Sequence, residues 1–223
     1  MTALPGADVP WSRRDLVLFV AWGTIAWLAL GGDVPLTYDE AFNYNALASQ
    51  GPRFVATHYP FANNHVLFTL LQSVALPARW VAHNPARLRA PNLLLALGLL
   101  VGLRRATTGA PSALRPWLVL GIALACPIFA TYLFVARGYL LTTLLLLVAV
   151  QLRVRGSVAS AAFACGLAGY TLPTSAFAFP GMVAVSLFTR LRWRDLATFH
   201  VLRREIVVPS MIFATIIGIG YWP

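Results

Sequence analysis

The sequence has no lysine and few charged residues of any kind. Only 11% of its 223 residues are charged, whereas soluble domains carry roughly 25%. Seven residues are acidic, and hydrophobic residues make up 59% of the chain. A soluble domain of this length could not bury so much apolar surface in one core, but a lipid bilayer accommodates it. The shortage of charge therefore argues against an ordinary soluble domain and predicts an integral membrane protein.

Cysteine is also scarce, and both cysteines lie inside apolar runs. Cys126 and Cys165 therefore indicate small buried residues rather than a disulfide or a metal site. All 17 basic residues are arginines, and the formal net charge is +10. They lie in clusters between the apolar runs, which is typical of cytoplasmic loops in membrane proteins. We expect the lipid bilayer as a partner, and no nucleic acid.

The apolar runs predict an all-α, polytopic membrane protein with about seven transmembrane helices. Residues 1–223 would form a single transmembrane domain. Arginine, proline or glycine stands at the ends of most runs and marks their limits. We expect the helices at residues 16–30, 91–105, 117–134, 140–152, 158–172, 177–188 and 206–221.

Two polar segments lie outside the predicted spans. Residues 33–89 contain three of the four histidines and three of the seven acidic residues. Within this first outer loop we expect a short helix over 39–50 and an amphipathic surface helix over 65–81. In residues 190–204, arginine and aromatic residues recur at helical spacing, which predicts an interfacial helix on the cytoplasmic leaflet.

The arginine distribution predicts the orientation. A cytoplasmic N-terminus places twelve of the 17 arginines on the cytoplasmic side and five outside, as the positive-inside rule requires. We therefore expect a multi-pass protein of the cell inner (plasma) membrane. The loop over 33–89 would face the periplasm or the exterior.

Adjacent carboxylates follow the first predicted span. Asp39 and Glu40 lie a few residues beyond it, between Tyr38 and Phe42. One interpretation is a solvated helix N-terminus, where acidic residues favour the helix dipole. The other is a partly buried carboxylate with a raised pKa, suited to act as a general base.

Asn64 and His65 begin the second helical segment of the loop. Asn64 suits a helix N-cap. His65 could instead bind a metal ion or a phosphate opposite the acidic residues. The two interpretations are compatible.

Arg137 and Tyr139 lie in the very short turn between the third and fourth predicted spans. A charged residue at this depth is costly, so it is a candidate site residue. The alternative is that Arg137 extends to a lipid headgroup. A phosphate bound within a site would also suit the fork of the guanidinium.

Five short motifs in this order resemble the GT-C superfamily of membrane glycosyltransferases, which use polyprenyl-phosphate sugars. Protein O-mannosyltransferases and aminoarabinose transferases are examples. The resemblance covers most of the chain as a linear order of weak motifs. The motifs are Asp39-Glu40-Ala41, Asn63-Asn64-His65-x-Leu67, Arg87 to Asn92, Arg137-Gly138-Tyr139 and Gly169 to Thr174.

The resemblance implies an inverting glycosyltransferase and assigns roles to these residues. Asp39 would be the general base that deprotonates the acceptor hydroxyl. Glu40 would help to place the acceptor or a divalent metal ion. His65 would bind that metal ion, or would belong to the substrate site by supporting the residues that contact the substrate. Arg137 would hold the lipid phosphate, with Asn64 and Tyr139 also in the substrate site.

Other interpretations stay open. A transporter or flippase-like binding protein for a lipid or solute would favour broken helices and charges at mid-membrane depth, and no acidic residue lies in the middle of a predicted span. Members of the GT-C superfamily are usually much longer than 223 residues. The chain could therefore be the N-terminal part of a longer protein, or an inactive accessory subunit.

Overall fold

The computed structural model describes residues 12–31, 35–58, 65–76, 78–106, 135–190 and 203–221, with a few isolated positions between 114 and 121. These residues are mostly helical and contain no strand. The prediction of an all-α protein is therefore confirmed for this part of the chain. The predicted span over 117–134 lies almost wholly outside the described residues, as do Asn64 and most of the predicted interfacial helix.

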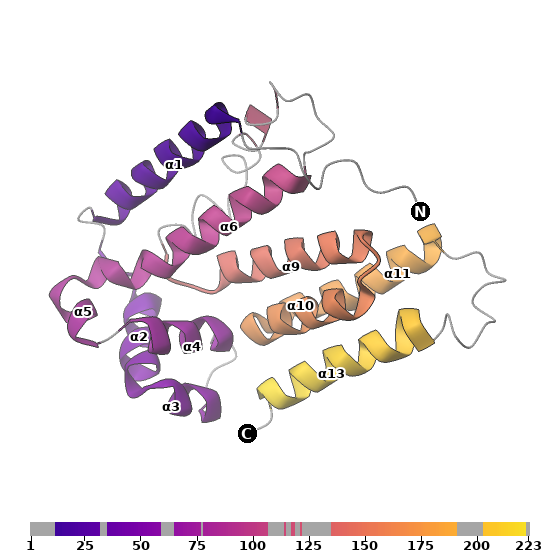
Figure 1. Ribbon diagram of the computed structural model, residues 1–223. Coiled ribbons are helices and arrows are strands. Elements are labelled where there is room, and N and C mark those ends of the chain that lie inside the picture. The colour runs from indigo at the N-terminus through magenta and orange to yellow at the C-terminus, as the bar shows by residue number, and fades with distance from the viewer. Residues whose placement is uncertain are drawn as a thin grey trace.

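The described part of the chain contains five long helices, which extend in roughly the same direction (Figure 1). Helix α6 packs against α1 and α9, and α10 packs between α9 and α13. Side chains of α6 and α9, among them Leu99, Leu100 and Leu140, form one apolar core. The five helices are α1 (Arg13–Gly31), α6 (Ala90–Ala106), α9 (Tyr139–Val154), α10 (Val158–Thr171) and α13 (Val208–Tyr221).

Helix α10 ends where proline requires it. Leu172 has an extended backbone (φ −139°, ψ 110°), because the residue before a proline avoids helical geometry. A 3₁₀ turn, η3 (Pro173–Phe177), then leads into α11 (Ala178–Arg190).

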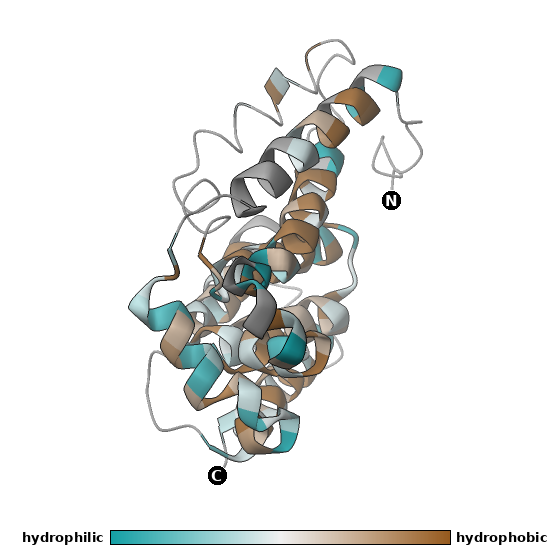
Figure 2. Cartoon of the chain, turned by 90° about the vertical axis from the view of Figure 1, so that its left-hand side faces the viewer, coloured by the Kyte–Doolittle hydropathy of each residue, from teal (hydrophilic) through white to brown (hydrophobic). Residues whose placement is uncertain are grey.

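The described residues between 35 and 89 fold into short helices at one end of the long ones (Figure 1). Hydrophilic residues are frequent among these short helices, whereas the long helices are mainly hydrophobic (Figure 2). The elements are α2 (Tyr38–Ala46), η1 (Ala48–Gln50), α3 (Pro52–Thr57), α4 (Val66–Ala75), α5 (Ala78–His83) and η2 (Pro85–Arg89).

Two predicted helices of the loop are each divided. The expected helix over 65–81 consists of α4 and α5, because Leu76 takes an extended backbone (φ −119°, ψ 92°) before Pro77. A proline makes that conformation the favoured one for the preceding residue. The expected helix over 39–50 divides at Leu47 into α2 and the 3₁₀ turn η1.

One helical stretch among the described residues is long and apolar enough to cross a bilayer. It runs from Arg203 to Tyr221, comprising the π-helical turn η5 (Arg203–Val207) and α13, and only 6% of its most apolar window is buried in the protein. The helices α9 and α10 have 16 and 14 residues, so they are about 24 and 21 Å long. A bilayer core is about 30 Å thick, and the count of seven spans stays a prediction.

Two ion pairs join the long helices at the end opposite to the short ones. Arg104 of α6 contacts Asp15 of α1 at 3.2 Å, and Arg153 of α9 contacts Glu205 at 2.6 Å. Both link the beginning of one helical stretch to the end of another. The long helices therefore have two chemically distinct ends, and the candidate site lies at the other one.

Candidate functional site

A capping box fixes the beginning of α2. The hydroxyl of Thr37 accepts the Glu40 N–H at 3.3 Å, and the Glu40 carboxylate accepts the Thr37 N–H at 2.8 Å. This reciprocal arrangement stabilises a helix N-terminus. Successive helical residues point about 100° apart, so Glu40 is buried in the protein while its neighbour Asp39 lies at the surface.

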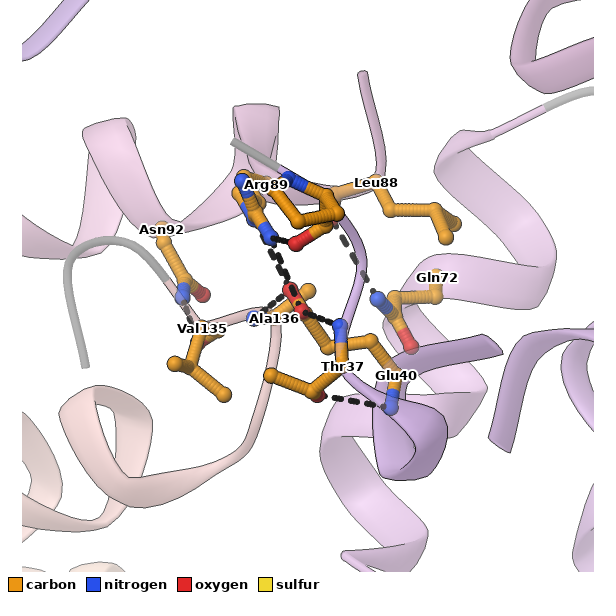
Figure 3. Close-up of polar contacts among 9 residues, drawn as sticks. Thr37, Glu40, Gln72, Leu88, Arg89, Asn92, Val135 and Ala136 are labelled. Atoms are coloured by element: carbon orange, nitrogen blue, oxygen red, sulfur yellow. Dashed lines mark hydrogen bonds and ion pairs between the residues drawn. The ribbon is translucent and has the colours of Figure 1, made fainter. Parts of the chain in front are cut away.

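Glu40 is the centre of a buried hydrogen-bond network (Figure 3). Arg89 donates from Nε and Nη2 to the two carboxylate oxygens, each at 2.9 Å. The Ala136 N–H donates to Oε1 at 2.7 Å, and Arg89 also donates to the Pro35 carbonyl at 3.0 Å. Neither charged side chain is exposed at all. The pair therefore connects three segments that are distant in sequence.

This network keeps Glu40 ionised. Burial by itself raises the pKa of Glu40, but hydrogen bonds from Arg89, Ala136 and Thr37 outweigh it and lower the pKa below its ordinary value. Both carboxylate oxygens are already engaged with donors. A metal ion or an acceptor hydroxyl at Glu40 would have to displace the Arg89 guanidinium. The geometry favours a structural role for Glu40 over the metal and catalytic roles expected from the sequence.

Asp39 has a different environment. Its carboxylate forms an ion pair with Arg137. The Asp39 side chain is 56% exposed, and the Arg137 side chain is 11% exposed. The Asp39 carboxylate is therefore accessible at the protein surface, whereas the Arg137 side chain is mostly buried next to it.

The segment that carries Arg137 is held by buried polar groups. Asn92 donates from Nδ2 to the Val135 carbonyl at 2.6 Å (Figure 3). Glu40 holds the next residue through the Ala136 N–H. Helix α9 then begins at Tyr139, with Gly138 as its N-cap. Arg137 is thus fixed at the N-terminal end of a long helix.

His65 is buried beside this helix end. It is 2% exposed, and its ring contacts the Tyr139 ring edge-on, with 4.7 Å between centroids. Within the described residues, neither of its ring nitrogens has a hydrogen-bond partner. Burial, together with the positive charge of Arg137, lowers the pKa of His65 to about 4, against the smaller opposing effects of the nearby Thr171 backbone and the Asp39 charge. His65 is therefore a neutral imidazole at neutral pH.

The close contact between His65 and Gly138 requires glycine. A Cβ atom added to Gly138 would lie 2.8 Å from the His65 Cβ and 2.8 Å from the Thr171 Cγ2. Such distances are well inside van der Waals contact. Any side chain at position 138 would therefore push His65 away from the end of α9.

A second polar network orients α2 against α4. Asn43 donates from Nδ2 to Gln72 at 3.2 Å and accepts from the Thr69 hydroxyl at 3.1 Å. Gln72 donates to the Leu88 carbonyl at 3.4 Å (Figure 3). These contacts join the helix that carries Asp39 to the segments that carry His65 and Arg89.

The predicted site residues fall into two groups. Asp39, His65, Arg137 and Tyr139 come together at one end of α9, whereas Glu40 lies in the network with Arg89. Asn64 lies outside the described residues, and the N-cap of α4 is His65, whose side chain makes no capping hydrogen bond. In the part of the chain described here, no three His, Cys, Asp or Glu side chains lie close enough to hold a metal ion.

Thr37, Arg89 and Asn92 were not predicted individually from the sequence as site residues. Thr37 had a local signal, because Thr-x-x-Glu before a helix is the capping-box pattern. Arg89 and Asn92 lie in the Arg87–Asn92 motif, but nothing local pairs Arg89 with a carboxylate 49 residues away. Only the fold brings them together.

Comparisons with protein-family models, with curated proteins and with solved structures found no match to this chain.

Proposed function

We propose that the protein is a multi-pass membrane glycosyltransferase of the GT-C type. It would transfer a sugar from a polyprenyl-phosphate donor to an acceptor on the outer face of the membrane. The observation that carries the proposal is the accessible Asp39 carboxylate paired with Arg137, at the end of the long helices where the first outer loop folds.

The two residues suit the two halves of an inverting transfer. Asp39 accepts the proton of the acceptor hydroxyl as that oxygen attacks the anomeric carbon of the sugar. Arg137 stabilises the charge on the polyprenyl phosphate as its bond to the sugar breaks. Because Asp39 pairs with Arg137, we expect the donor phosphate to take the place of Asp39 at the guanidinium. That exchange releases the carboxylate for the acceptor.

The membrane placement is part of the proposal. The apolar stretch Arg203–Tyr221 supports it, because a bilayer-length helix that is only 6% buried leaves its apolar side chains facing outward. The predicted seven spans and the cytoplasmic N-terminus would place the Asp39–Arg137 pair outside, where a lipid-linked donor can reach it from the bilayer.

The test is sugar transfer in membrane vesicles that contain the full chain and a radiolabelled polyprenyl-phosphate sugar. Asp39→Asn should reduce transfer by about 10²- to 10⁴-fold, which is the usual contribution of a general base. Asp39→Glu keeps a carboxylate and should retain part of the activity. Arg137→Gln should also reduce transfer, whereas Arg53→Gln, at an exposed arginine of the same loop, should not.

Wild-type transfer by Asp39→Asn would remove Asp39 from the base role. Flux of the lipid-linked sugar across vesicles without any product would favour the transporter instead. Transfer that stops with EDTA and returns with added Mg²⁺ or Mn²⁺ would support the divalent metal ion expected from the resemblance.

A further inference from the structure

A surface cavity lies between the beginnings of α10 and α13, at the end of the long helices away from the short ones (Figure 1). Its volume is about 400 Å³, within the usual range of about 300–1,000 Å³ for ligand sites. Two of the described residues that line it are arginines, and none of them is acidic. The lining residues are Ser157, Val158, Ala159, Arg203, Arg204 and Val208.

The packing of α10 against α13 is closest further along the two helices. A Cβ atom added to Gly166 would lie 2.8 Å from Ile216 Cδ1, and one added to Gly169 would lie 2.6 Å from Ile217 Cδ1. Glycines allow such a close approach between helices in membranes. Both helices begin at the same end of the molecule (Figure 1), and there Val158 and Val208 line the cavity.

Positive charge dominates the polar part of the cavity. Arg203 and Arg204 are both exposed, and the Arg204 side chain is 67% exposed. The nearby carboxylate of Glu205 forms its closer ion pair with Arg153, at 2.6 Å, and lies 3.9 Å from Arg204 Nε. Glu205 therefore mainly balances the charge of Arg153. The planar forks of the two lining arginines suit a phosphate.

The rest of the lining is mainly apolar and continues onto an exposed apolar surface. Met211 follows Val208 by three residues and is 65% exposed, and Phe163 follows Ala159 by four residues and is 51% exposed. Residues at these spacings are neighbours on one helix face. The stretch Arg203–Tyr221 is also the one of bilayer length among the described residues. The ligand that fits this surface has an anionic head and a hydrocarbon tail.

We propose that this cavity binds the headgroup of an anionic phospholipid, with the phosphate at Arg203 and Arg204 and an acyl chain along Val208 and Met211. The predicted orientation would place this end in the cytoplasmic leaflet, where anionic lipids attract basic residues. The inference rests on the membrane placement in the proposed function and is independent of sugar transfer, because the Asp39–Arg137 pair lies at the other end of the long helices.

Lipid binding to the full chain in detergent micelles tests the proposal, with native mass spectrometry as the measurement. The probes are dioleoyl phosphatidylglycerol, dioleoyl phosphatidylcholine and inorganic phosphate. Phosphatidylglycerol should bind about 10- to 30-fold more tightly than phosphatidylcholine, as expected for two basic residues beside an anionic lipid. Equal affinity for the two lipids would overturn the proposal. Displacement of phosphatidylglycerol by inorganic phosphate would overturn the assignment to a lipid.

Substitution of the arginines tests their part in binding. Arg203→Gln and Arg204→Gln should each weaken phosphatidylglycerol binding about fivefold, the contribution of one basic residue at an anionic surface. The double variant should bind phosphatidylglycerol no better than phosphatidylcholine. Arg155→Gln is the matched control, because Arg155 is exposed at the same end but does not line the cavity. Unchanged binding in the double variant, or an equal loss in Arg155→Gln, would overturn the proposal.

Ala159→Phe tests the cavity without any change of charge. Ala159 is exposed, so the larger side chain should leave the fold intact, which circular dichroism checks. It should fill the cavity and reduce phosphatidylglycerol binding to the level of phosphatidylcholine. Wild-type affinity in this variant would show that the lipid binds elsewhere and would overturn the proposal.

These measurements need no sugar and no acceptor, so they separate the two proposals. Asp39→Asn should bind phosphatidylglycerol like the wild type, because Asp39 lies far from the cavity. Lipid binding through Arg203 and Arg204 in a chain that transfers no sugar would keep the lipid site and remove the glycosyltransferase. Sugar transfer that depends on Asp39, without a preference for phosphatidylglycerol, would do the reverse.

Discussion

Two adjacent carboxylates of α2 have opposite environments. Glu40 is fully buried, and two Arg89 nitrogens and two backbone N–H groups saturate its oxygens. Asp39 is 56% exposed and has its ion pair with Arg137 at the surface. Residue type and position in the sequence hardly distinguish the two. Burial and the number of hydrogen-bond donors distinguish them. Glu40 has the environment of a structural carboxylate, whereas Asp39 is accessible to a substrate.

The largest expected effect is a loss of stability on substitution of Glu40, which substitution of Asp39 should not reproduce. Glu40→Ala removes the carboxylate that balances the charge of the buried Arg89 guanidinium, and the loss of one member of a buried ion pair typically costs about 3–5 kcal/mol of unfolding free energy. Asp39→Ala breaks a pair whose carboxylate is 56% exposed, and a pair at the surface is worth about 1 kcal/mol or less. Chemical unfolding in mixed micelles, followed by circular dichroism, measures both.

Glu40→Gln is the matched control, because it keeps the size of the side chain and removes its charge. It should lie between the wild type and Glu40→Ala. Equal losses of stability for Asp39→Ala and Glu40→Ala would mean that the difference in burial has no energetic consequence. The comparison between the two carboxylates would then fail.

A somewhat smaller effect should appear in the pH dependence of stability, through His65. In the folded protein His65 stays neutral down to a pKa of about 4, whereas its ordinary value is 6.5. Between these pH values the unfolded chain binds the proton and the folded chain does not. Stability therefore falls as the pH decreases from 6.5 to 4, by roughly 3 kcal/mol at most.

His65→Gln cannot take up a proton, so the stability of this variant should change less over the same range. Because the pKa of Glu40 is lowered in the folded protein, protonation of Glu40 also reduces stability in acid. This contribution is the same in the wild type and in His65→Gln, so it cancels when their unfolding free energies are subtracted. Identical pH profiles for the wild type and His65→Gln would show that His65 is not held neutral by the fold. Asp39 and Arg137 are the charged residues whose electric field acts on the ring.

Local patterns in the sequence were sufficient to predict most of the long helices. The runs near 16–30, 91–105, 140–152 and 158–172 correspond closely to α1, α6, α9 and α10, because apolar content, arginine, glycine and proline are local signals. The division between α4 and α5 also had a local cause in Pro77, which the amphipathic pattern over 65–81 concealed.

The organisation of the site could be predicted only in part. The sequence selected Asp39, His65 and Arg137, which do come together, but could not assign Glu40 to Arg89. That pairing depends on how residue 40, residue 89 and the segment before α9 pack, and no spacing in the chain encodes it. The burial of His65 likewise depends on Gly138 and Thr171, more than 70 residues further along the chain.

The smallest expected effect concerns phosphate affinity, and it tests how Asp39 and the donor share Arg137. If the donor phosphate must replace Asp39 at the guanidinium, then Asp39→Asn removes a competitor. It should tighten the binding of geranylgeranyl phosphate, a polyprenyl phosphate without a sugar, about two- to fivefold, the equivalent of one exposed ion pair. Asp39→Glu keeps the charge and should bind like the wild type. A weaker affinity in Asp39→Asn would show that the carboxylate helps to bind the donor. Tighter binding in a variant that has lost sugar transfer is a combination that neither misfolding nor a purely structural Asp39 produces, because both would lower affinity and activity together.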